Sequence, residues 1–245
     1  MSKTVILIPS RLSATRLPGK PLLKINGTSI ISHVVNKAKE ADIGDVYVAT
    51  EDKEIIEDVN LNGGKAVLTS NKHKTGTDRI YECFEKLSLK DIEYIINLQG
   101  DEPDIDINDL KILNRFAEIN KPDIGTLASE INLKSNLSNE NIVKVITDTK
   151  ITYNNFPIAL DFKRKVDNLK INIYHHLGIY AYKPNVLKKL INYEQTINEI
   201  KNRLEQLRAM ENGIKINVAL AKFSSKGIDT MEDYLALKKK LEYKS

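Results

Sequence analysis

The stretch VILIPSRLSATRLPGKPL, residues 5–22, decides the fold of this chain. It opens with four consecutive apolar residues, 5–8, which is typical of a parallel strand buried on both faces. A loop follows, since proline and glycine interrupt any regular helix or strand beyond residue 8. The interrupting residues are Pro9, Pro18, Gly19 and Pro21.

Strand-like and helix-like segments alternate after this loop. The predicted strands lie at 46–50, 65–69 and 94–99, and the predicted helices at 30–38, 52–59 and 77–87. Such alternation predicts parallel strands joined by right-handed crossovers. We therefore expect a Rossmann-like α/β fold, with a mostly parallel mixed central sheet and helices on both faces.

The second half of the chain is less regular. Its predicted strands lie at 123–131, 141–147, 176–182 and 215–221, and its predicted helices at 184–192, 194–211 and 231–242. The stretch 148–175 is polar and weakly patterned, so we expect an excursion from the main sheet there. No linker interrupts the chain, and we predict one domain over residues 1–245.

Composition narrows the class of ligand. The chain has 245 residues, of which 41% are hydrophobic and 29% charged, and its formal net charge is +4. Residues 1–39 hold seven Lys/Arg and no Asp or Glu. A mild excess of positive charge without dense basic clusters favours an anionic small molecule over nucleic acid.

Cysteine usage and hydropathy indicate the compartment. Cys83 is the single cysteine, which excludes an internal disulfide and a cysteine-based zinc site. No apolar run approaches the roughly 18 residues that a membrane span needs. We expect a cytoplasmic protein without membrane insertion.

Polar segments follow several of the predicted strands. They lie at 9–21, 71–79, 99–104 and 222–230. Ligands of open α/β sheets bind beyond the carboxyl ends of the strands. These four segments are therefore expected to converge on one site.

The loop 9–21 carries three cations, Arg11, Arg16 and Lys20. It is not a P-loop, because Ala14 and Pro21 stand where that motif requires glycine and serine or threonine. Side-chain cations and loop amides together still favour a phosphate site. The alternative is a solvated basic turn, against which the position after the first strand and the acid-free neighbourhood both argue.

Two carboxylates are candidate Mg²⁺ ligands. Asp101, in LQGDEP, directly follows a predicted strand, and Asp229 lies in GIDTMED before the last helix. Magnesium takes one or two protein carboxylates and receives other ligands from substrate phosphates. The alternative for each is a structural cap of the following helix, although Asp106 or Thr230 can fill that role.

Other polar residues allow structural and functional interpretations. Arg79 and the amino end of its helix can face an anion, or Arg79 is a surface residue. His175 and His176 are adjacent in a predicted strand, so they point to opposite faces and cannot chelate one metal. Glu205 and Gln206, on the predicted helix 194–211, are equally consistent with a solvated face.

Six motifs, in this order and spacing, resemble the 3-deoxy-manno-octulosonate (Kdo) cytidylyltransferases, also called CMP-Kdo synthetases. The motifs are IPSRLSATRLPGKPL, TGTDRIYE, NLQGDEP, HLGIYAY, LEQLRAMENG and GIDTMEDY. The resemblance spans residues 4–240. It implies a nucleotidyltransferase fold and a homodimer, with the excursion near 132–195 helping to form it. It also implies a Mg²⁺-dependent enzyme that makes CMP-Kdo and pyrophosphate from CTP and Kdo for lipopolysaccharide synthesis.

The resemblance also implies roles for individual residues. Arg11 and Lys20 match the cations that hold the triphosphate, with Arg16 beside them, and Asp101 and Asp229 match metal ligands. The positions that match contacts to the sugar or the nucleotide are Arg79, Gln99, His176, Tyr180, Glu205 and Gln206.

The chain departs from the family pattern at two positions. Asn155 stands where an arginine is expected, and His175 stands where an arginine or lysine is usual. Loss of a cation near the sugar leaves a related acid sugar open, such as 8-amino-Kdo or a sialic acid. A non-catalytic nucleotide-binding regulator is the alternative from another class, and the joint presence of Lys20, Asp101 and Asp229 argues against it.

Overall fold

The computed structural model describes residues 2–13, 16–131, 137, 139–166, 172–222 and 227–242. The chain divides into two units, one formed by Met1–Ile107 with Ser225–Ser245 and the other by Asn108–Ser224. The expectation of one domain over 1–245 stays a prediction.

The sheet of the first unit has the strand order β6-β1-β4-β5, and its pairs are parallel. These strands are β1 (Thr4–Ser10), β4 (Asp45–Thr50), β5 (Ala66–Leu68) and β6 (Tyr94–Asn97). The apolar run 5–8 is wholly buried in β1, which pairs on both edges. The prediction of a buried parallel strand there is confirmed.

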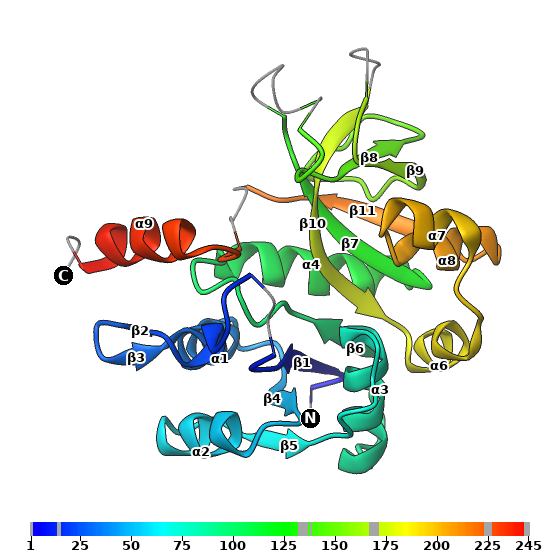
Figure 1. The fold of residues 1–245 in the computed structure, drawn as a ribbon. Coiled ribbons are helices and arrows are strands. Elements are labelled where there is room, and N and C mark those ends of the chain that lie inside the picture. The colour runs from blue at the N-terminus through cyan, green and yellow to red at the C-terminus, as the bar shows by residue number, and fades with distance from the viewer. Residues whose placement is uncertain are drawn as a thin grey trace. The chain divides into compact units, whose positions relative to one another are not determined.

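Helices cover both faces of this sheet. The helices α1 (Ile30–Glu40) and α2 (Lys53–Leu61) lie on one face, and α3 (Gly76–Leu87) lies on the other (Figure 1). The chain steps from β1 to β4 to β5 and then returns past β1 to β6. Because crossovers are right-handed, this reversal places α3 on the opposite face. The reversal point lies between β1 and β6, where an open α/β sheet binds its ligands.

The second unit contains a mixed sheet. Its strands are β7 (Ile124–Ser129), β8 (Lys144–Thr147), β9 (Ala159–Lys163), β10 (Ile173–Tyr182) and β11 (Ile216–Leu220). The pair β11–β7 is parallel, whereas β7–β10, β10–β8 and β8–β9 are antiparallel. Its helices are α4 (Ile107–Asn120), whose first residue belongs to the first unit, α6 (Pro184–Asn192), α7 (Ile197–Asn202) and α8 (Gln206–Glu211). The prediction of a mixed α/β fold is confirmed.

One predicted helix is wrong. The segment 194–211 is two helices, α7 and α8, because Arg203 ends α7 in the left-handed region with φ 53°. The break lets Arg208 of α8 turn back onto Glu199 of α7, with Nε and Nη2 donating to its carboxylate at 2.8 and 2.5 Å. Both side chains are buried. A continuous helix would leave this buried ion pair unmade.

Two features of the fold were not expected. The hairpin β2 (Lys24–Ile25) and β3 (Thr28–Ser29) precedes α1, and β9 lies within the weakly patterned stretch 148–175. The excursion expected near 132–195 also includes residues 132–136, 138 and 167–171, which lie outside the described residues.

The last helix, α9 (Met231–Glu242), packs on the loop that follows β1. Tyr234 and Ile228 share a buried cluster with Leu17, Ile25 and Ile30. The Tyr234 hydroxyl also donates to the Lys24 carbonyl at 2.7 Å. These contacts bring a segment from the end of the chain beside its beginning.

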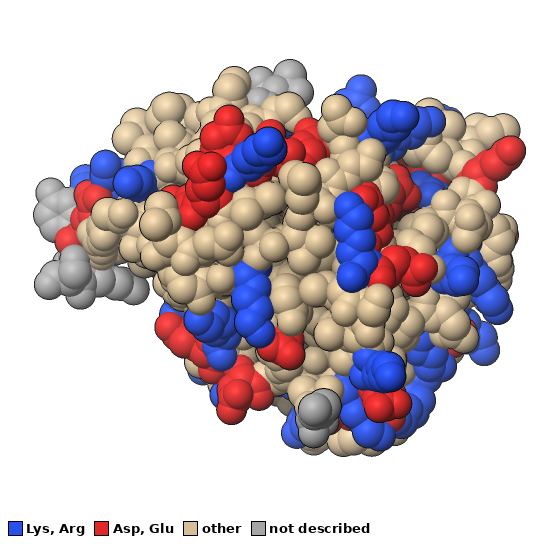
Figure 2. All heavy atoms as spheres, turned by 90° about the horizontal axis from the view of Figure 1, so that it is seen from below, with Lys and Arg blue, Asp and Glu red and all other residues tan. Residues whose placement is uncertain are grey.

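Charged side chains of both signs are interspersed on the face shown in Figure 2, without an extended area of one sign. Among the described residues, no helix is both long enough and apolar enough to cross a membrane.

Candidate active site

A pocket of about 380 Å³ lies in the first unit, beyond the carboxyl ends of β1 and β6. Its lining comes from the predicted polar segments 9–21, 71–79, 99–104 and 222–230, so the convergence of these segments is confirmed. The lining residues are Pro9, Ser10, Arg11, Arg16, Leu17, Lys20, Pro21, His73, Lys74, Thr75, Gly76, Arg79, Gln99, Gly100, Asp101 and Asp229.

Local hydrogen bonds fix the loop after β1. The Gly19 amide donates to the Leu12 carbonyl at 3.1 Å, and the Leu12 amide donates to Asp52 Oδ2 at 2.7 Å. Gly19 has φ 70°, a conformation that glycine adopts without the steric cost of a Cβ. Lys20 then begins a short 3₁₀ turn, Lys20–Leu22. The basic loop is therefore held in one shape rather than left as a solvated turn.

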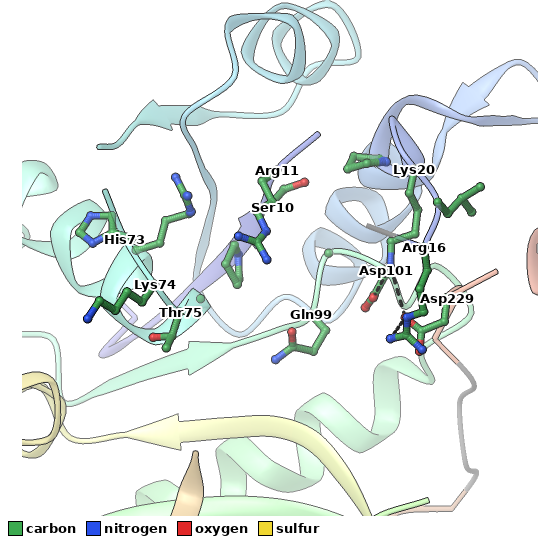
Figure 3. Close-up of a pocket in the computed structure, with 16 residues that line it drawn as sticks. Ser10, Arg11, Arg16, Lys20, His73, Lys74, Thr75, Gln99, Asp101 and Asp229 are labelled. Carbon is green, nitrogen blue, oxygen red and sulfur yellow. Dashed lines mark hydrogen bonds and ion pairs between the residues drawn. The ribbon is translucent and has the colours of Figure 1, made fainter. Parts of the chain in front are cut away.

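The Lys20 ammonium lies between two carboxylates. Its Nζ donates to Asp101 Oδ2 at 2.6 Å and to the Ile228 carbonyl at 2.6 Å, and lies 3.8 Å from Asp229 Oδ1. Arg16 Nη2 pairs with the same Asp229 oxygen at 3.0 Å (Figure 3). The loop after β6 and the segment before α9 thus place Asp101 and Asp229 around one cation.

The structural alternative for these aspartates fails on geometry. The cap of α9 is Thr230, whose Oγ1 accepts from the Asp233 amide at 3.2 Å while Asp233 Oδ2 accepts from the Thr230 amide at 3.0 Å. The Asp229 carboxylate takes no part in this capping box. Asp101 lies well before α4 begins at Ile107, so it does not cap that helix.

Gly100 lets the two strand-end loops meet. A Cβ at this position would lie 2.8 Å from the Pro9 carbonyl oxygen and 3.3 Å from Ile31 Cδ1. Real Cβ atoms do not approach backbone so closely, so any larger residue would push the Asp101 loop away from β1. The motif LQGDEP did not by itself predict that Gly100 allows this close contact between the two loops.

Arg79 lines the pocket, yet its guanidinium is held inside the protein. Nη1 donates to Thr69 Oγ1 at 2.7 Å and to the Ser70 carbonyl at 3.3 Å, and Nη2 pairs with Glu51. The side chain is buried. Arg79 therefore joins α3 to the segments after β4 and β5, and its contact with a sugar carboxylate stays a prediction.

The amino end of α3 also faces the pocket. Thr75 caps the helix, since its Oγ1 accepts from the Asp78 amide at 3.2 Å. In turn, Asp78 Oδ2 accepts from the Thr75 amide. Nearby, Glu82 accepts from His73, from Lys86 and from the Ser70 amide. Burial alone would raise the pKa of Glu82, but these hydrogen bonds outweigh it and lower the pKa to about 2.

Positive charge exceeds negative charge in the pocket. Its lining includes Arg11, Arg16, Lys20, Lys74 and Arg79 against the two aspartates. Within the described part of the chain, Arg11 and Lys74 form no ion pair. Arg11 lies between the Lys20 cluster and the His73–Thr75 segment in Figure 3. An anion entering the pocket can therefore meet two uncommitted cations.

Lys74 is a pocket residue that sequence reasoning missed. The available signal was its position in the polar segment 71–79, beside Arg79. Gln99 and Arg16 line the pocket as the resemblance implies. Among the described residues, no group of three or more His, Cys, Asp or Glu could hold a metal ion.

The other predicted site residues lie in the second unit. The rings of His176 and Tyr180 on β10 have centroids 5.4 Å apart, and His176 also meets the Phe162 ring at 4.9 Å. Glu205 and Gln206 begin α8, held next to α7 by the Arg208–Glu199 pair.

Burial keeps both β10 side chains neutral. Burial first, and then His175, lower the pKa of His176 to about 3. Burial, followed by Tyr182 and Glu205, raises the pKa of Tyr180 well above its ordinary value. A neutral imidazole and a neutral phenol can each donate and accept a hydrogen bond, as a sugar hydroxyl also does.

The two departures from the family pattern are structurally distinct. The Asn155 side chain closes a turn, accepting from the Thr152 amide at 2.7 Å and donating to the Lys150 carbonyl at 2.8 Å. His175 is half-buried and pairs in register with Lys144 of β8, and burial together with Lys144 lowers its pKa.

Comparisons with known proteins identify the family of the chain. The family model described as cytidylyltransferase matches residues 5–216. A 3-deoxy-manno-octulosonate cytidylyltransferase of Thermodesulfovibrio yellowstonii is 41% identical, with 94% of each chain covered. One of Afipia carboxidovorans is 39% identical, with 96% of each chain covered.

A solved structure of CMP:2-keto-3-deoxy-manno-octonic acid synthetase complexed with CTP is similar over 100% of both chains, with a TM-score of 0.90 and 34% identity. A cytidylyltransferase structure from Leptospira borgpetersenii shares the fold, with a TM-score of 0.66, 19% identity, and 99% of this chain and 88% of that chain covered. From its motifs, its fold and these relatives, the chain belongs to the family of the 3-deoxy-manno-octulosonate cytidylyltransferases.

Proposed function

We propose that this chain transfers CMP from CTP to the anomeric C2 hydroxyl of Kdo, releasing pyrophosphate and giving CMP-Kdo for lipopolysaccharide synthesis. The observation that carries the proposal is the placement of Lys20, Asp101 and Asp229 around one point of the pocket. Phosphoryl and nucleotidyl transfers depend on positioning and charge neutralisation, and these three groups supply charges of both signs at one place.

Cations of the pocket would receive the triphosphate. Arg11 and Lys74 have no ion-pair partner among the described residues, and α3 begins beside them with a capped amino end. A helix amino terminus and flexible cations together favour a polyanion. Lys20, whose side chain is only 12% exposed, would also contact the phosphates.

Asp101 and Asp229 fit a Mg²⁺ ion. Both carboxylates already converge on a cation in the form of the Lys20 ammonium, and neither serves as a helix cap. Bound Mg²⁺ would neutralise charge on the α-phosphate and favour ionisation of the attacking hydroxyl. The chain's own contribution is to hold the two carboxylates and Lys20 together through the loops that meet at Gly100 and Ile228.

The two ring side chains proposed to contact the sugar, His176 and Tyr180, are neutral. His176 and Tyr180 are both buried and uncharged, and they would hydrogen-bond hydroxyls of the acid sugar, with Glu205 and Gln206 nearby in the same unit. Asn155 is used in a turn and gives no cation to the sugar carboxylate. This departure supports a related acid sugar, such as 8-amino-Kdo, as the second candidate substrate.

We further propose a cytoplasmic homodimer. Large apolar side chains are exposed in the second unit at Tyr153, Leu160, Ile197 and Ile200. Exposed large apolar side chains can form part of a protein–protein contact. The family resemblance implies that the excursion near 132–195, which includes Tyr153 and Leu160, helps to form the dimer.

A substrate panel tests the proposed function. Purified protein is incubated with CTP, Mg²⁺ and, in parallel, Kdo, 8-amino-Kdo or a sialic acid, and pyrophosphate release is measured. We expect the highest kcat/KM with Kdo. Preference for 8-amino-Kdo would establish the second candidate, and preference for the sialic acid would overturn the assignment. Binding of CTP without pyrophosphate release from any of the three would favour the non-catalytic regulator.

A further inference from the structure

Strand β10 is irregular opposite Thr126 of β7. Leu177 pairs with Leu127, but the next partner, Thr126, pairs with Tyr180, so two residues bulge from the ladder. The bulge turns the carbonyl oxygens of Leu177 and Ile179 toward the Thr126 hydroxyl, which lies 3.2 and 2.7 Å from them. Thr126 is wholly buried.

The same hydroxyl meets the His176 ring. Thr126 Oγ1 lies 3.1 Å from His176 Nε2. A threonine hydroxyl has one proton and two lone pairs, whereas a carbonyl oxygen only accepts. Two of the three neighbours of Oγ1 are carbonyl oxygens, so its proton goes to one of them, and the nearer is that of Ile179.

The imidazole must then be the donor toward Thr126. If Oγ1 gave its proton to Nε2 instead, its lone pairs would face two carbonyl oxygens inside the protein, which is an unfavourable arrangement for buried polar atoms. His176 is neutral because burial and His175 lower its pKa to about 3, so it carries one ring proton. That proton lies on Nε2, and Nδ1 keeps a lone pair.

We infer that Thr126 is a positioning residue that fixes His176 as the Nε2–H tautomer and so presents Nδ1 as a hydrogen-bond acceptor for a sugar hydroxyl. The inference rests on the proposed function for the identity of the sugar, but the tautomer itself does not. Among the described residues, Nδ1 has no hydrogen-bond partner. A tautomer held by a partner on the other ring nitrogen is the usual way in which proteins orient a functional histidine.

Nitrogen NMR of the ring tests the tautomer directly. The full chain is labelled with ¹⁵N-histidine; it has four histidines, and His176 is assigned by loss of its signals in His176→Asn. We expect wild-type His176 to be protonated at Nε2 and unprotonated at Nδ1 at neutral pH. In Thr126→Val, which keeps the shape but lacks the hydroxyl, a fraction of Nδ1–H tautomer is expected, and Thr126→Ser should restore the wild-type spectrum.

Kinetics test the consequence for the substrate. Thr126→Val should lower kcat/KM for Kdo by about tenfold, the size of one hydrogen bond, and leave KM for CTP unchanged. Thr126→Ser should recover most of this loss. The matched control is Thr147→Val on β8, which removes a buried hydroxyl that donates to the Thr149 carbonyl at 2.7 Å and does not touch His176. We expect wild-type kinetics from it.

Several results would overturn the inference. An Nδ1–H tautomer in the wild type would do so even if Thr126→Val failed to fold. So would a Thr126→Val protein that kept the wild-type tautomer, or a Thr147→Val protein that lost as much kcat/KM as Thr126→Val. A wild-type enzyme without turnover of any acid sugar would overturn the proposed function, and the ring spectrum would still decide the role of Thr126.

Discussion

Asp229 and Thr230 are neighbours with separate tasks. Thr230 and Asp233 close the capping box of α9, while the Asp229 carboxylate turns away from the helix toward Arg16 and Lys20. Because Thr230 caps the helix, the Asp229 carboxylate is available to the pocket. Replacing it should therefore affect chemistry rather than folding.

We expect Asp229→Asn to lower kcat with CTP and Kdo by about a hundredfold or more, because the proposed Mg²⁺ would lose a carboxylate ligand to a neutral amide. Its thermal unfolding midpoint should stay close to that of the wild type. Steady-state pyrophosphate release and a thermal melt on the same preparation measure both quantities.

Thr230→Ala is the matched control for that substitution. Loss of a helix cap costs about 1 kcal/mol of stability, so this variant should melt at a lower temperature and keep the specific activity of its folded fraction. If Asp229→Asn behaved like Thr230→Ala, the carboxylate would be structural and the metal assignment would be wrong.

At the scale of elements, Glu82 anchors α3 to the segment that follows β5. Its carboxylate accepts from the Ser70 amide at 2.8 Å, from Lys86 at 2.7 Å and from His73. The same segment leads into Lys74 and Thr75 at the pocket. The anchor therefore stabilises the wall of the pocket that α3 supports.

The pH dependence of stability should show this anchor. The pKa of Glu82 lies at about 2 in the folded chain, below its ordinary value of 4.5. The ionised carboxylate therefore stabilises the fold fully above the ordinary value, and this contribution is lost as pH falls toward about 2. Urea unfolding of wild type and Glu82→Gln should give a constant difference in unfolding free energy near neutral pH that shrinks across this acidic range.

A difference between these two proteins that stayed constant through the acidic range would contradict the lowered pKa of Glu82. Both proteins should have the same circular dichroism spectrum at neutral pH, which confirms that the comparison concerns one fold.

At the scale of the whole molecule, exposed apolar side chains are candidates for the contact of the proposed dimer. In the second unit, Ile197 is 84% exposed at the start of α7, and Leu160 is 58% exposed on β9. In the first unit, Leu61 is 87% exposed at the end of α2. If the dimer contact lies in the second unit, a charge at Ile197 and a charge at Leu61 should have different effects.

We expect Ile197→Glu to weaken the proposed dimer by at least about tenfold in Kd, since a buried unpaired charge opposes association. Leu61→Glu, at an equally exposed position of the first unit, should leave the dimer intact. Sedimentation velocity over a range of protein concentrations measures both. A wild-type chain that sediments as a monomer would overturn the dimer, and equal effects of the two substitutions would move its contact elsewhere.

Local sequence signals predicted most of the elements. The alternation of apolar runs gave the parallel strands of the first unit, and helix α6 coincides with the predicted segment 184–192. The caps Ser29 and Thr75 are of the residue types that favour a helix start, and each accepts a backbone hydrogen bond. These features depend on residues close together in the chain, where period and side-chain type contain the needed information.

The failures share a physical cause. The segment 194–211 has a helical pattern throughout, yet a buried ion pair between Glu199 and Arg208 favours two short helices. Strand β9 lies in a polar stretch and exists because β8 provides a partner for its backbone. In both cases the stabilising partner belongs to another packed element, and apolar periodicity does not report such a contact.

By itself the sequence determined most of the strands and helices and the polar segments at the strands' carboxyl ends, because these follow from local apolar periodicity and from proline and glycine. Only the tertiary structure decided what each polar side chain does. In the folded chain, Arg79 pairs with Glu51, and Thr230 rather than Asp229 caps α9. Lys20 pairs with Asp101, which is 81 positions away. Contacts at such separations depend on how the elements pack, and a run of neighbouring residues does not contain that information.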